Sequence, residues 1–123
     1  MSDLWNYRDL LVWQRAMDLT DEIYSLTHKL PKEELHGLSD QMRRAAVSVP
    51  SNIAEGHRRN SPREFIRFLN IANGSCAELE TQLEITVRQN LLTRSDIAKA
   101  FHYCTEIGKM INSLTYSLKH KPE

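Results

Sequence analysis

The feature that most constrains this chain is a helical repeat of apolar residues, which recurs in four separate segments. In the first segment the gaps between apolar positions are four and three residues, as in Val12, Ala16, Leu19, Ile23, Leu26 and Leu30. This spacing places the apolar side chains on one face of an amphipathic helix. We therefore predict a first helix at about residues 9–30.

The same periodicity predicts three further helices, at about residues 38–56, 62–89 and 95–119. Short connections between helices favour antiparallel neighbours, so we expect residues 1–123 to form one domain, an all-α up-down-up-down antiparallel four-helix bundle. The chain contains only four glycines and four prolines. This scarcity argues against an all-β fold, which needs many turns.

The breaks between these segments carry signals for helix ends. Pro31 is expected to stop the first helix, because the residue before a proline disfavours the α conformation. Gly56 is expected to end the second helix in the left-handed conformation. The run Ser61-Pro62-Arg63-Glu64 predicts a capping box with proline at the first helical position. The run Thr93-Arg94-Ser95-Asp96 predicts a similar start for the fourth helix.

The second helix is apolar around most of its circumference and contains Pro50. One stripe is formed by Leu38, Met42, Ala45, Val49 and Ile53, and a second patch by Ala46, Val47, Pro50 and Ala54. A helix of this kind is buried on two sides, so we predict that the second patch forms contacts between subunits. We also expect a kink near Pro50, with Ser48 and Ser51 beside the carbonyl that the proline leaves free.

Gly74 lies in the middle of the third predicted helix, next to Ser75 and near Ala77. A glycine in a helix interior costs about 1 kcal/mol relative to alanine. Such a cost is tolerable where another backbone must approach closely.

Charge is unevenly distributed, although the formal net charge is zero. Residues 40–67 carry a local net charge of +3, and residues 75–106 carry −2. Since guanidinium groups bind phosphate well, we predict contact with nucleic acid through Arg43, Arg44, Arg58, Arg59, Arg63 and Arg67. The alternative is a solvated corner in which Glu55 and Glu64 form local salt bridges with these arginines.

An enzymatic alternative would use Ser51, Asn52, Glu55 or His57. Nucleophilic catalysis needs a nucleophile, a base and a group that orients the base, and no such spacing is visible here. We therefore expect no catalytic residues and no cofactor.

A metal site and a membrane location are equally unsupported by the sequence. His102 and Glu106 are four residues apart on the fourth helix, a spacing that suits a surface pair better than a metal site. Cys76 and Cys104 lie in apolar stripes and are predicted to be reduced, buried thiols of a cytoplasmic protein. We expect no signal peptide and no membrane span.

Three motifs together resemble a known family. Asp-Leu-x-Val-Trp-Gln occupies residues 9–14, Gln-x-x-Arg-Ala-x-x-Ser-x-Pro-x-Asn-Ile-Ala-Glu-Gly occupies 41–56, and Phe-Leu-x-x-Ala-x-Gly-Ser occupies 68–75. These motifs closely resemble the bacterial family of four-helix bundle proteins that is also called 23S rRNA intervening-sequence proteins. The chain is also similar to the accessory protein of diversity-generating retroelements, a pentameric bundle that works with nucleic acid.

The resemblance implies an up-down four-helix bundle, assembly as a homopentamer and no established enzymatic activity. The expected partners are further copies of the chain and RNA or another nucleic acid, with a protein partner as a further option. The leading hypothesis is thus a non-enzymatic oligomer that contacts RNA through its arginines. The alternative is a protein-interaction scaffold with no role in nucleic-acid binding.

Overall fold

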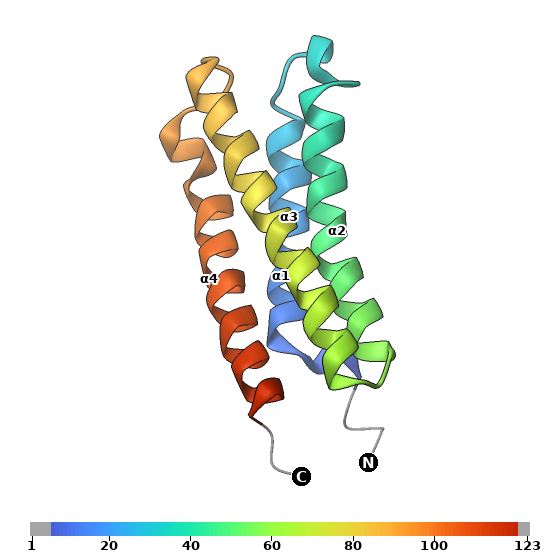
Figure 1. Ribbon diagram of the computed structural model, residues 1–123. Coiled ribbons are helices and arrows are strands. Elements are labelled where there is room, and N and C mark those ends of the chain that lie inside the picture. The colour runs from blue at the N-terminus through green and yellow to red at the C-terminus, as the bar shows by residue number, and fades with distance from the viewer. Residues whose placement is uncertain (1–5, 121–123) are drawn as a thin grey trace.

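The computed structural model describes residues 6–120 as a bundle of four long helices (Figure 1). These are α1 (Leu11–Thr27), α2 (Leu38–Arg58), α3 (Pro62–Arg88) and α4 (Arg94–Lys119). Each helix runs antiparallel to the next along the chain, and α4 packs against α1 (Figure 1). The prediction of an up-down-up-down four-helix bundle is therefore confirmed.

The periodic apolar positions of all four helices meet in one core. Its fully buried side chains include Leu19 and Ile23 of α1, and further members are Met42, Ile53, Leu69, Leu79, Leu83, Ile107 and Ile111. Burying an aliphatic side chain of this size stabilises a fold by about 1.5–3 kcal/mol. The core therefore fixes which face of each helix points inward and which points to solvent.

The first helix is shorter than predicted at both ends. Tyr7–Asp9 form a 3-10 helix, η2, and the following Leu10 is extended, so α1 begins only at Leu11. At the other end α1 stops at Thr27, because the amides of Lys29 and Leu30 turn back onto Leu26 and Thr27 in a tight turn before Pro31. A second short 3-10 helix, η3 (Lys32–Glu34), then leads to α2.

Gly56 does not end the second helix, so that prediction is wrong. The helix continues to Arg58, and the left-handed residue is Asn60, with φ of 58°. Gly56 is buried inside α2, where an added Cβ would lie 2.5 Å from the Cβ of Phe68 in α3. Glycine at this position therefore serves the close packing of α2 on α3, while the short polar side chain of Asn60 tolerates the turn.

The two predicted helix starts differ in how complete they are. Thr93 and Asp96 form a full capping box: the Asp96 amide donates to Thr93 Oγ1 over 3.0 Å, and the Thr93 amide donates to Asp96 Oδ2 over 2.9 Å. At α3 only half of the box is present. The Glu64 amide donates to Ser61 Oγ over 3.3 Å, but the Glu64 carboxylate turns to arginine side chains instead.

Pro50 lies inside α2, which is helical on both sides of it. Ser48 and Ser51 were expected beside the carbonyl that Pro50 leaves free, and the hydroxyl that lies 3.3 Å from this carbonyl, that of Ala46, belongs to Thr20 of α1. Ser48 Oγ instead lies 2.8 Å from Ser75 Oγ of α3 and accepts from Asn52 Nδ2 over 2.9 Å. Ser48 thus connects α2 to α3, and Thr20 connects α1 to α2.

Candidate nucleic-acid interface

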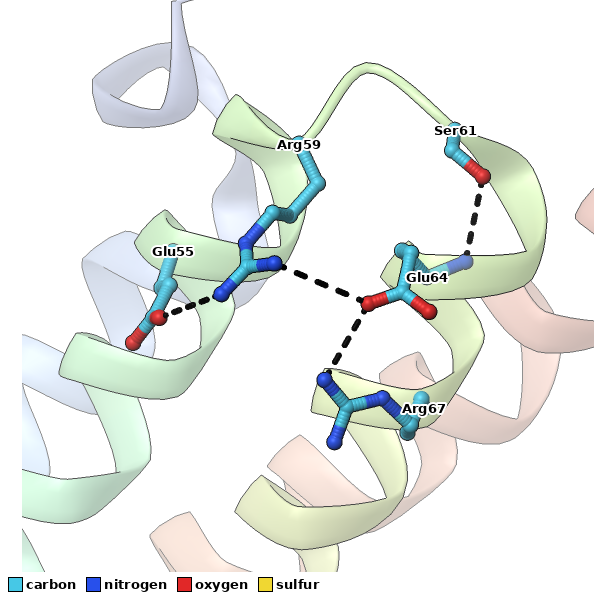
Figure 2. Close-up of polar contacts among 5 residues, drawn as sticks. All are labelled: Glu55, Arg59, Ser61, Glu64 and Arg67. Atoms are coloured by element: carbon cyan, nitrogen blue, oxygen red, sulfur yellow. Dashed lines mark hydrogen bonds and ion pairs between the residues drawn. The ribbon is translucent and has the colours of Figure 1, made fainter.

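Four of the six predicted arginines gather where α2 turns into α3, and we call Arg58, Arg59, Arg63 and Arg67 the arginine corner. Figure 2 shows its chain of ion pairs, which runs from Glu55 through Arg59 and Glu64 to Arg67. Arg59 Nη2 lies 3.0 Å from Glu55 Oε2, and its Nη1 lies 3.9 Å from Glu64 Oε1. Arg67 Nη2 lies 3.1 Å from the same Glu64 oxygen. The last turn of α2 is thereby held to the first turn of α3.

An aromatic ring lies beneath these ion pairs. The guanidinium carbon of Arg59 lies 5.0 Å from the centre of the Phe68 ring, and that of Arg67 lies 4.5 Å from it. Both distances fit a cation–π interaction. The sequence analysis missed this role of Phe68, since its apolar periodicity indicates only a core position. Carboxylates and the ring together fix the directions in which Arg59 and Arg67 point.

Arg58 and Arg63 complete the corner without a carboxylate partner among residues 6–120. Both are exposed, and Arg58 lies 5.8 Å from the centre of the Tyr7 ring. Arg63 lies in the first turn of α3, where the helix dipole adds partial positive charge. With four guanidinium groups against Glu55 and Glu64, the corner keeps an excess of positive charge that suits an anionic partner.

The neighbouring arginines keep Glu64 ionised. The hydrogen bond from Arg67 is the main reason that the pKa of Glu64 lies below its ordinary value, and the charges of Arg59 and Arg63 act in the same direction. Burial, and then the charge of the nearby Arg58, lowers the pKa of the His57 imidazole below its ordinary value, which disfavours a positive charge on this ring. Its ring packs edge-on against Phe65, with ring centres 5.6 Å apart.

The remaining two predicted arginines lie elsewhere. Along α2, Arg43 and Arg58 are separated by about 22 Å at the helical rise of 1.5 Å per residue. Arg43 donates to Thr27 Oγ1 over 2.8 Å and lies 4.7 Å from the centre of the Tyr24 ring. Arg44 pairs with Asp40 at 3.0 Å. The structure therefore divides the predicted set into the arginine corner and a second basic pair toward the start of α2.

The residues of the enzymatic alternative do not form a catalytic arrangement. The Asn52 side chain donates to the carbonyl and hydroxyl of Ser48, and Glu55 pairs with Arg59. No hydrogen bond joins Ser51, Asn52, Glu55 or His57 to another of these four among the residues that the structure describes. The geometry accordingly gives no nucleophile that is activated by a base.

The four residues predicted for subunit contacts differ in accessibility. Ala46 is completely buried in the core of its own chain, and Pro50 is also buried. Val47 is exposed and Ala54 is half-buried. With Pro50 they line an open groove between α1 and α2, with a volume of about 340 Å³. The predicted interface stays untested, but Val47 and Ala54 carry most of the surface that it could use, while Ala46 offers none.

The remaining predicted residues have local roles. Cys76 and Cys104 are free and buried, as predicted, and the neighbouring Cys76 together with burial raises the pKa of the Cys104 thiol. His102 Nε2 lies 3.9 Å from Glu106 Oε1, an oxygen that also pairs with Arg15 at 3.0 Å. Within residues 6–120 we find no group of three or more His, Cys, Asp or Glu side chains arranged to hold a metal, and no helix suited to crossing a membrane.

Comparison with known proteins identifies the family to which this bundle belongs. The sequence pattern described as "23S rRNA-intervening sequence protein" matches residues 8–113. The chain belongs to this family. The match includes α1, α2 and α3 in full together with most of α4.

A solved structure agrees with the family match. It is that of a protein of unknown function from the S23 ribosomal protein family of Bacteroides thetaiotaomicron, which is 29 % identical to this chain. The alignment covers 85 % of this chain and 98 % of that one, with a TM-score of 0.78. No curated protein matches the chain. Family and fold are thus established, and the named relative brings no known activity with it.

Proposed function

We propose that this member of the 23S rRNA-intervening sequence protein family is a non-enzymatic, self-associating bundle that binds RNA through its arginine corner. The observation that carries the proposal is the excess of guanidinium groups there, with Arg58 and Arg63 not engaged by any carboxylate of residues 6–120. Exposed guanidinium groups donate paired hydrogen bonds to phosphate oxygens. The family's name, which refers to ribosomal RNA, favours RNA as the polyanion.

Self-association supports RNA binding because one corner makes few phosphate contacts. The formal net charge of the chain is zero, so no global attraction adds to the local patch. Affinity for a polyanion grows with the number of phosphates that are neutralised. An assembly that presents several corners to one RNA raises the effective concentration of each. We expect a homopentamer, as the family resemblance implies, and a cytoplasmic location, as the reduced, buried cysteines suggest.

The test is a salt titration of binding to a fluorescently labelled fragment of ribosomal RNA, followed by anisotropy. We expect the double variant Arg58→Glu/Arg63→Glu to bind at least about tenfold more weakly at low salt, and to reduce the salt slope by about 1.5–2. The matched control is Lys99→Glu/Lys109→Glu, which makes the same change in net charge at two exposed positions of α4. Circular dichroism and native mass verify that both variants stay folded and assembled.

Unchanged binding by the corner variant would contradict the assignment of the corner as the RNA site. Equal weakening by both variants would show that net charge alone governs binding. Absence of any RNA binding by an assembled wild-type protein would favour the second candidate function, a protein-interaction scaffold. The exposed apolar groove between α1 and α2 is the observation that favours this alternative.

A further inference from the structure

The groove between α1 and α2 adjoins a second hollow on the same face of the bundle. This second hollow has a volume of about 690 Å³ and is lined by Tyr24 of α1 and by residues of α2 between Asp40 and Asn52. Val47 and Ser51 line both the groove and the hollow, so the two meet there. We call them together the α1–α2 cleft, which follows α2 over more than half of its length.

Two cations lie at the end of the cleft that adjoins the arginine corner. The guanidinium carbons of Arg8 and Arg58 lie 5.5 and 5.8 Å from the centre of the Tyr7 ring, and Tyr7 itself lines the groove. Neither arginine forms an ion pair with a carboxylate of residues 6–120. Because Arg58 also belongs to the arginine corner, the cleft and the corner form one continuous surface.

The other end of the cleft carries a cation whose charge is likewise not offset. Arg43 lines the second hollow and lies 4.7 Å from the centre of the Tyr24 ring, and no carboxylate of residues 6–120 pairs with it. The neighbouring Arg44 differs, because Asp40 pairs with it at 3.0 Å. Along α2, Arg43 and Arg58 are separated by about 22 Å. The cleft therefore has unpaired positive charge at both ends.

Between these ends the cleft offers aromatic rings and hydrogen-bonding groups. Trp13 is half-buried in the groove, and Tyr24 in the second hollow is 40 % exposed. The Ser51 hydroxyl is exposed and has no hydrogen-bond partner among residues 6–120. The Asn52 amide nitrogen donates to Ser48, which leaves the amide oxygen as an acceptor. Unpaired bases are recognised by such a combination of stacking and hydrogen bonds to their edges.

We propose that the α1–α2 cleft binds a segment of single-stranded RNA, with phosphates at Arg58 and Arg43 and with bases stacked on Trp13 and Tyr24. At about 3.4 Å per stacked nucleotide, the distance of about 22 Å between the two arginines corresponds to about six nucleotides. A duplex cannot use the cleft in this way, because its bases are stacked and paired with one another. This inference rests on the proposed function: the corner attracts RNA, and the cleft selects an unpaired strand.

Charge favours RNA over an apolar protein partner as the occupant of the cleft. A protein-interaction scaffold, or a subunit contact through Val47 and Ala54, would use the same surface. An apolar partner would leave Arg43 and Arg58 without a counter-ion at its margins. The phosphates of an RNA strand supply a counter-ion at each end and accept charge-assisted hydrogen bonds from both guanidinium groups.

A comparison of two labelled RNAs tests the inference. One is a single strand of about twelve nucleotides, long enough to fill the cleft, and the other is the blunt duplex of the same sequence. In anisotropy titrations we expect Tyr24→Leu to weaken binding of the single strand at least about fivefold, and binding of the duplex by less than about twofold. Tyr116→Leu is the matched control, because it removes an exposed tyrosine of α4 that lines neither the groove nor the hollow.

A second variant tests the cleft without removing an aromatic ring. Ser51→Glu places a carboxylate where the groove and the second hollow meet. We expect it to weaken binding of the single strand at least about tenfold, because the carboxylate repels phosphates and occupies the space of a base. Ser113→Glu is the control, since it adds the same charge at an exposed position of α4. Circular dichroism and native mass are measured for all variants.

The outcomes separate this inference from the proposed function. A wild-type protein that binds neither RNA overturns both. Equal affinity for strand and duplex, with a loss only in Arg58→Glu/Arg63→Glu, leaves the corner as the RNA site and overturns the cleft. Equal weakening by Ser51→Glu and Ser113→Glu also overturns the cleft. A changed native mass in Ser51→Glu overturns it as well, because the cleft would then be a contact between subunits.

Discussion

The hydroxyl oxygen of Thr20 in α1 lies 3.3 Å from the carbonyl oxygen of Ala46 in α2. In a regular helix this carbonyl would accept from the amide of residue 50, but Pro50 has no N–H. The Thr20 hydroxyl shares its single hydrogen between this carbonyl and the Ala16 carbonyl, which lies 2.9 Å away, and so supplies in part the donor that α2 lacks. It does so beneath the open groove between α1 and α2, because Thr20 and Pro50 both line that groove.

We expect Thr20→Val to lower the free energy of unfolding by about 1–3 kcal/mol, because it leaves the Ala46 carbonyl without a donor at nearly constant shape. In a Pro50→Ala background we expect Thr20→Val to lower the free energy of unfolding by less, because an alanine at position 50 restores the helical N–H. Urea denaturation of wild type, Thr20→Val, Pro50→Ala and the double variant measures the coupling free energy between positions 20 and 50. Thr81→Val is the control, because Thr81 bonds only the Ala77 carbonyl of its own helix. Equal costs in both backgrounds would contradict the proposed relationship.

We expect Gly56→Ala to destabilise the protein by about 1–3 kcal/mol, although alanine favours a helix more than glycine does. The added Cβ would lie 2.5 Å from the Cβ of Phe68, so α2 and α3 would have to separate. Gly108→Ala is the matched control, since its nearest neighbour, Asn73 Oδ1, is at an ordinary 3.5 Å. Thermal or urea unfolding distinguishes the two variants. A Gly56→Ala protein as stable as Gly108→Ala would refute the close-packing role.

These two sites show where prediction from the sequence succeeded and where it did not. Apolar periodicity correctly predicted four helices, because each helix buries a single stripe that is readable at local spacing. The roles of Gly56 and Thr20 depend on residues in other helices, Phe68 and Ala46, which no local pattern indicates. Glycine near a helix end suggested a terminator, but Asn60 takes the left-handed conformation instead.

The candidate site was predictable to a similar degree. The clustering of Arg58, Arg59 and Arg63 follows from their neighbouring positions in the sequence, and Arg67 joins them one turn further along α3. The sequence could not show that Glu64 would leave its capping role to pair with Arg67 and Arg59. Nor could it show that Phe68 would lie beneath both guanidinium groups. Which arginines remain free for phosphate is thus a property of the folded corner.

The capping box of α4 predicts a defined dependence of stability on pH. The hydrogen bonds from the Thr93 amide and hydroxyl lower the pKa of Asp96 below its ordinary value of 3.8. The folded state therefore favours the ionised carboxylate, and its contribution to stability is complete above pH 3.8 and is lost as the pH falls through the lowered pKa. We expect Asp96→Asn to be less stable than wild type at pH about 6, with a difference that shrinks below pH 3.8. Urea midpoints of both proteins across this pH range measure the difference in stability. A difference that does not change with pH would contradict the role of the Asp96 carboxylate.

Glu64 holds two arginines of the corner, so its removal should strengthen RNA binding. In Glu64→Gln the Arg67 guanidinium loses its carboxylate partner and becomes available to phosphate, while Arg59 keeps its ion pair with Glu55 at 3.0 Å. We expect a several-fold tighter complex at low salt and a steeper salt slope by about 1. Glu84→Gln is the matched control, because Glu84 holds Arg94 through two hydrogen bonds of 2.6 and 2.9 Å, away from the corner. Both variants change the net charge equally, so an anisotropy titration in which only Glu64→Gln binds more tightly identifies the corner as the RNA site. Equal gains in RNA affinity for both variants would assign the effect to net charge. A weaker complex with Glu64→Gln would mean that RNA recognises the ion-paired arrangement in Figure 2 itself.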